Sequence, residues 1–109
     1  MRIDFHELEP NVIHNYCGGE KDTVTRVFAD EKNKIIRAVL EPGASIGSHC
    51  HETSSEIIYI LQGQGCTLYE GERIPLAAGD CHYCPKGKTH SLINDSDADL
   101  RFFAVVPEQ

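Results

Sequence analysis

Short apolar segments separated by turn residues follow one another along most of the chain. Residues 23–29 and 34–41 are rich in β-branched and aliphatic side chains, and a polar turn at 30–33 separates them. This pattern predicts a hairpin that ends at Pro42-Gly43. Further short strands are predicted at 56–61, 66–69, 73–76, 81–84, 89–93 and 100–106. No apolar stripe with a helical period extends over three turns, so the pattern favours an all-β sandwich or barrel.

The first 22 residues lack this regularity. Pro10 and the pair Gly18-Gly19 interrupt them, and one short strand is expected there, at 3–5 or at 12–13, followed by a loop. The barrel itself is expected to comprise residues 23–109. A chain of 109 residues suits a single domain with a modest core, and no internal repeat divides it.

The segment 56–61 is apolar on both faces. A strand with one wet face should alternate between apolar and polar side chains, and this one does not. Its two faces carry Glu56, Ile58 and Ile60 on one side and Ile57, Tyr59 and Leu61 on the other. The second face is therefore expected to be covered by another sheet or by a partner chain, and the latter predicts a homodimer.

The charge and cysteine content limit the classes of binding partner and indicate a cellular compartment. The chain has 10 basic and 17 acidic residues, a net charge of −7, with the acids scattered along the sequence. This balance opposes binding to nucleic acids or anionic membranes. No apolar run approaches a membrane span, and the charged first residues do not resemble a signal peptide, so a cytoplasmic location is expected. In that compartment the five cysteines are expected to be reduced thiols.

The histidines and one glutamate suggest a metal site. His49 and His51 are two residues apart, so in an extended strand both imidazoles project from the same face. Glu56 opens the next apolar run, and His90 is the best candidate for a fourth ligand. One alternative is a polar barrel core in which these histidines only form hydrogen bonds. Three imidazoles and one carboxylate suit a divalent Mn, Fe, Ni, Co or Zn ion and leave coordination positions open on a six-coordinate ion.

The spacing of these residues also carries a resemblance. Residues 43–63 read G-x5-H-x-H-x4-E-x6-G, and residues 79–94 read G-x5-P-x-G-x2-H-x3-N. These stretches resemble the two signature motifs of the cupin superfamily, in order and with a short linker, as in small single-domain microbial cupins. The resemblance covers about half of the chain. It implies a small jelly-roll β-barrel with metal ligands at His49, His51, Glu56 and His90, but no single reaction.

Two classes of function follow from a metal site in such a barrel. The first is a metalloenzyme that activates a sugar, a keto acid or a dicarboxylate by Lewis-acid catalysis, as an isomerase, lyase, decarboxylase or dioxygenase. The alternative is a module that binds or senses a small molecule without turnover. Candidate substrate-binding residues are Arg37, as a clamp for a carboxylate at the barrel mouth, His82 and Tyr83.

Other conspicuous residues are interpreted as structural. Cys81 and Cys84 have the spacing of a chelating or redox pair, but residues three apart in a strand face opposite sides. Cys50 lies between two candidate ligands and is interpreted as a small apolar filler. Asn94, the last position of the second motif, is expected to cap a turn.

Overall fold

A computed structural model describes residues 1–109 of the protein. Nearly all regular structure is β, and two short 3-10 turns, η1 (Phe5–Glu7) and η2 (Tyr16–Gly18), flank the first strand. The strands are β1 (Asn11–His14), β2 (Asp22–Ala29), β3 (Asn33–Leu40), β4 (Ser45–Cys50), β5 (Glu56–Gln62), β6 (Gln64–Tyr69), β7 (Glu72–Ala77), β8 (Cys81–Cys84), β9 (Thr89–Ile93) and β10 (Leu100–Pro107). No helix is long and apolar enough to cross a membrane.

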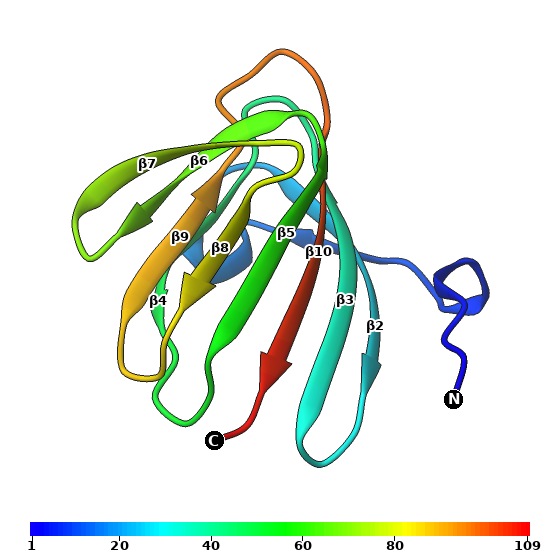
Figure 1. Cartoon of the computed structure of the whole chain (residues 1–109). Coiled ribbons are helices and arrows are strands. Elements are labelled where there is room, and N and C mark those ends of the chain that lie inside the picture. Colours follow the sequence, from blue (N-terminus) through cyan, green and yellow to red (C-terminus); the bar gives the residue numbers. More distant parts are fainter.

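The strands form two antiparallel sheets that face each other (Figure 1). One has six strands in the order β1-β2-β3-β10-β5-β8, and the other has four in the order β4-β9-β6-β7. The last strand, β10, lies between β3 and β5, so residues far apart in sequence become neighbours. This arrangement is a jelly-roll barrel and confirms the predicted fold class.

The core lies between the two sheets and follows from strand alternation. On β10, Leu100, Phe102 and Ala104 are buried, whereas the residues between them are only partly buried. Aliphatic side chains from the other strands complete the core: Leu40, Ile58, Ile60, Leu76 and Leu92. Each fully buried side chain of this size contributes about 1.5–3 kcal/mol relative to an exposed one.

The N-terminal segment joins the six-stranded sheet. Strand β1 pairs with β2 from Asn11–Thr25 to His14–Asp22 and confirms the strand predicted at 12–13. The alternative at 3–5 is wrong, because Phe5 begins the turn η1. That turn packs outside the barrel, where Arg26 donates hydrogen bonds to the Phe5 and Leu8 carbonyls at 3.2 and 2.6 Å.

Strand β5 has two apolar faces, as its sequence predicts. Ile58 and Ile60 lie in the core and are 2% and 0% exposed, whereas three large apolar side chains on the other face are exposed to solvent. Tyr83 of β8 lies beside them, because it pairs with Ile57. We name this the outer patch; its members are Ile57, Tyr59, Leu61 and Tyr83, exposed by 38%, 42%, 40% and 54%.

Candidate metal centre

Four residues from three places in the chain converge at one end of the barrel. His49 lies on β4 opposite His90 on β9, and Glu56 begins β5. His51 immediately follows β4, where its backbone exchanges hydrogen bonds with the β8–β9 turn. The turns after β4 and β8 lie at the same end of the molecule as the β2–β3 turn (Figure 1). One ligand atom from each of the four side chains lies within 4.8 Å of the others.

Glu56 lies between the three imidazoles. Its Oε1 is 2.9 Å from Nε2 of His51, 2.9 Å from Nε2 of His90 and 3.8 Å from Nε2 of His49. Burial favours a higher pKa for Glu56, but the three imidazoles outweigh it and hold that pKa well below its usual range. The same carboxylate raises the pKa of His49. Glu56 is therefore an anion at neutral pH.

Each imidazole also has a hydrogen-bonding partner at Nδ1, the ring nitrogen that faces away from Glu56. Nδ1 of His49 is 2.8 Å from the Gly47 carbonyl oxygen, Nδ1 of His51 is 3.3 Å from the Ser54 hydroxyl, and Nδ1 of His90 is 3.0 Å from Nε2 of His82. A ring that donates from Nδ1 leaves the Nε2 lone pair free. The three Nε2 lone pairs and the Glu56 carboxylate then converge within 4.8 Å of one another, and this is the donor set that a divalent transition metal takes.

His82 lies behind His90 and supports this set, and it is not among the residues that line the cavity. It is 6% exposed on β8, behind His90. Burial, with a smaller effect from His90, lowers the pKa of His82 to about 4. The ring is therefore neutral at neutral pH and accepts the His90 Nδ1–H, which fixes the tautomer of His90.

The His82→Phe variant is expected to bind metal about 10–100-fold more weakly, because His90 loses the acceptor that orients it. Competition with a metal-binding dye measures this affinity. Tyr83→Phe is the matched control, since it lies next in the same strand but faces outward. Equal affinities in the two variants would contradict the orienting role of His82.

Arg37 and Tyr83, the other two predicted substrate-binding residues, lie away from this centre. Ala38 and Leu40 occupy the inner face of β3, so strand alternation turns Arg37 outward. Arg37 lies there opposite Arg26 in the register of the neighbouring strand β2. Arg37 lines a small hollow on the outer surface. Tyr83 belongs to the outer patch.

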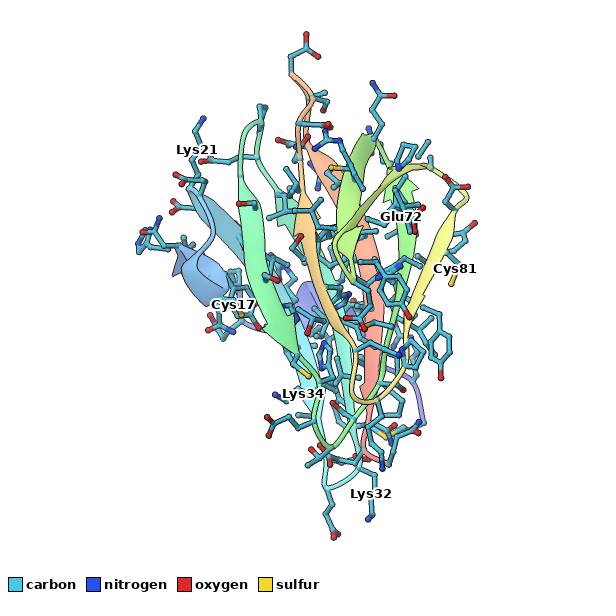
Figure 2. All side chains as sticks on the ribbon, turned by 90° about the vertical axis from the view of Figure 1, so that its left-hand side faces the viewer. Cys17, Lys21, Lys32, Lys34, Glu72 and Cys81 are labelled. Atoms are coloured by element: carbon cyan, nitrogen blue, oxygen red, sulfur yellow. The ribbon has the colours of Figure 1, made fainter.

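A cavity of about 950 Å³ adjoins the four candidate ligands. The β2–β3 turn forms part of its rim, and Figure 2 shows Lys32 and Lys34 at that end of the molecule. Tyr16 and Cys17 of η2 also line the cavity, and sequence reasoning did not identify either as part of a site. Only their position next to the pair Gly18-Gly19 distinguishes them in the sequence.

Two glycines allow η2 to pack closely against β4, because neither has a Cβ atom. A Cβ at Gly19 would lie 2.0 Å from the Ser45 carbonyl oxygen, and a Cβ at Gly47 would lie 2.0 Å from the Cys17 carbonyl oxygen. Cys17 itself has a left-handed backbone, with φ of 54°. This close approach places Tyr16 and Cys17 at the cavity wall.

The thiols form no second cluster. Cys84 is buried and Cys81 is exposed, which confirms that the two face opposite sides of β8. Cys50 is exposed, so its interpretation as a buried filler is wrong. Figure 2 shows Cys17 and Cys81 on opposite sides of the molecule. All five cysteines are free thiols.

Metal occupancy is expected to fall as the pH is lowered from about 8 to about 5, because imidazole must be neutral to bind a metal and has an ordinary pKa of about 6.5. The Glu56 carboxylate raises the pKa of His49, so a proton competes with the metal for this ring at a higher pH than for an ordinary imidazole. Elemental analysis after equilibration at each pH measures it. Constant occupancy over this range would count against ligation by histidine.

Comparison with known proteins gives a consistent family assignment. A sequence profile for the cupin domain matches residues 36–106. An oxalate-binding protein of Thermotoga maritima is 35% identical over 97% of this chain and 93% of its own length. The crystal structure of a predicted oxalate decarboxylase from the same organism superposes over 100% of both chains, with 33% identity and a TM-score of 0.94.

A more distant structure shares the fold. The polyketide cyclase RemF from Streptomyces resistomycificus has a TM-score of 0.81 at 21% identity, over 98% of this chain and 78% of its own. The matched profile covers well over half of the chain and includes all four converging residues. The fold, the two motifs and the profile together show that this chain belongs to the cupin domain family.

Proposed function

We propose that His49, His51, Glu56 and His90 hold one divalent transition metal ion, and that this centre binds a small carboxylate of the oxalate type. The observation that carries the proposal is the orientation of the three rings, each held at Nδ1 and directing Nε2 toward one anionic carboxylate. The Thermotoga relative, which is named for oxalate binding, supports the ligand class.

The chemistry follows from the donor set. Four protein ligands leave coordination positions open on a six-coordinate ion. A bound ion of this kind supplies a Lewis acid that attracts and polarises carboxylate oxygens. The protein contributes a preformed pocket, because Glu56 and the rings are fixed by mutual contacts and by backbone groups before any ligand enters.

Turnover is the second candidate, and Tyr16 is the observation that favours it. Its phenol lines the same cavity, and burial, followed by the charges of Cys17 and Glu56, raises its pKa above the ordinary value. The hydroxyl therefore stays protonated at neutral pH and can donate a hydrogen bond or a proton. In a decarboxylation the carbon–carbon bond to the leaving carboxylate breaks, carbon dioxide departs, and the bonding electron pair stays on the remaining carbon, which takes up that proton.

The proposal is tested by calorimetric titration of oxalate into metal-free and manganese-loaded protein. Binding is expected only in the loaded protein, and not in Glu56→Gln treated in the same way. Formate and carbon dioxide released from oxalate distinguish turnover from binding alone. The absence of oxalate binding to the loaded protein, or equal binding without metal, would overturn the proposal.

We also propose that a second copy of the chain covers the outer patch. Four large apolar side chains on adjacent strands present a contiguous face of the kind that a two-fold contact buries against itself. Light scattering of the native chain at micromolar concentration is expected to give a dimer, and Tyr59→Glu a monomer. Val12→Glu is the control, since Val12 is 55% exposed on β1, outside the patch. A monomeric native chain would contradict the proposal.

A further inference from the structure

The cavity is far larger than oxalate requires. Its volume of about 950 Å³ lies near the upper end of the range, roughly 300–1,000 Å³, that accommodates drug-sized ligands. Oxalate occupies about as much space as a few water molecules, each of which takes roughly 30 Å³. A ligand of that size bound at the metal centre would leave most of the cavity filled with water.

Part of the cavity wall is aliphatic. Half-buried side chains from β1, β2, β3, β4 and β10 form this part: Ile13, Val27, Ile36, Ile46 and Val106. Polar side chains, among them Thr25 on β2, line the rest. Water makes no hydrogen bonds with this apolar surface. An apolar group that displaces the water binds with a favourable free energy that grows with the apolar area buried.

The charges around the cavity favour one polar end in the ligand. No arginine lines it, and its only ammonium groups are those of Lys32 and Lys34, both exposed at the β2–β3 end. Asp30 and Glu31 lie on the same turn and offset them. A second carboxylate placed along the aliphatic wall would therefore have no cationic partner, and its burial there would be unfavourable.

We propose that the preferred ligand is an α-keto or α-hydroxy acid with an apolar body. Its carboxylate head lies at the metal centre, and its aliphatic or aromatic substituent packs on the wall formed by Ile13, Val27 and Ile36. The inference rests on the proposed function for the head and extends it to the rest of the molecule. Each methylene group buried on the wall is expected to tighten binding by roughly fourfold.

Val27 provides a position where the wall can be changed without changing the centre. It faces inward on β2 and pairs with Ile36, and strands β3 and β10 separate β2 from β5, which carries Glu56. Val24, on the same strand, faces the outer surface and lines the hollow beside Arg37. Val27→Phe and Val24→Phe are therefore the same substitution on opposite faces of one strand.

The test is calorimetric titration of manganese-loaded protein with pyruvate, α-ketoisovalerate and phenylpyruvate, which share one head and differ in the apolar body. Phenylpyruvate is expected to bind about tenfold or more tightly than pyruvate. In Val27→Phe this gain is expected to disappear, because the larger ring takes the space of the ligand's apolar body; in Val24→Phe the gain is expected to remain. Ile13→Phe, on the edge strand β1, repeats the test at a second wall position.

The outcomes separate this inference from the proposed function. If oxalate and pyruvate bind the loaded protein but phenylpyruvate binds no more tightly than pyruvate, the apolar body is refuted and the metal-dependent carboxylate site stands. Full retention of the gain in both Val27→Phe and Ile13→Phe also refutes it, because the body then lies elsewhere. If none of these acids binds the loaded protein, the proposed function fails and this inference fails with it.

Discussion

The Glu56→Gln variant is expected to lose more than about 100-fold in metal affinity. Loss of a residue that only orients a ligand costs roughly 10–100-fold, and Glu56 is the single anion among the four candidate ligands. Its carboxylate lies 2.9 Å from Nε2 of both His51 and His90, so the neutral amide removes the charge from the middle of the cluster. Competition with a metal-binding dye measures the affinity.

Glu52→Gln is the matched control, because Glu52 is exposed in the turn between His51 and Glu56 and belongs to no cluster of ligand atoms. It is expected to bind metal as the native chain does. If Glu56→Gln retained native affinity, the carboxylate would not be a ligand, and the cluster would be a hydrogen-bonded polar core. That alternative leaves the fold intact and removes the basis of the proposed function.

The Asn94→Ala variant is expected to lose about 3 kcal/mol or more in the free energy of unfolding. The side chain is fully buried, and its amide group donates to the carbonyl oxygens of Leu40, Glu41 and Ala98 at 2.9, 3.1 and 2.8 Å. Its Oδ1 accepts from the backbone N–H and the hydroxyl of Ser96. The two N–H groups of the amide share the three carbonyl oxygens, so Asn94 makes about four hydrogen bonds that contribute roughly 1 kcal/mol each, and alanine leaves the buried carbonyl groups without this donor.

Thermal unfolding of the metal-free protein measures this loss, and the midpoint is expected to fall by more than about 10 °C. The control is Asn11→Ala, since Asn11 is exposed on β1. Its stability is expected to stay within about 0.5 kcal/mol of the native value. An equal effect of the two substitutions would contradict the role of Asn94 as the tie between the chain after β9 and the end of β3.

Much of the fold was predictable because strand alternation is a local property. The segments 81–84 and 89–93 match β8 and β9 residue for residue, and the other predicted strands differ from the observed ones by one or two residues at their ends. The convergence of His49, His51, Glu56 and His90 also depends on short spacings, namely a strand, a tight turn and the pairing of β4 with β9. Their resemblance to known motifs strengthened that prediction.

Other placements were not predictable, because a sequence does not state which face of a strand points inward. Arg37 and Tyr83 face outward, because Ala38 and Cys84 occupy the inner positions beside them. His82 does face inward, yet it lies behind His90, at a depth that alternation does not specify. The cavity and the contact of η2 with β4 depend on segments distant in sequence, so no local pattern reports them.

X-ray absorption spectroscopy of the zinc-loaded protein tests the central claim most directly, because it identifies the atoms bound to the metal. We predict a first shell of nitrogen and oxygen with the scattering pattern of imidazole, no sulfur, and fewer imidazoles in His51→Ala. Sulfur in the first shell would assign the metal to the cysteines. A shell without imidazole would likewise contradict a centre built from His49, His51, Glu56 and His90.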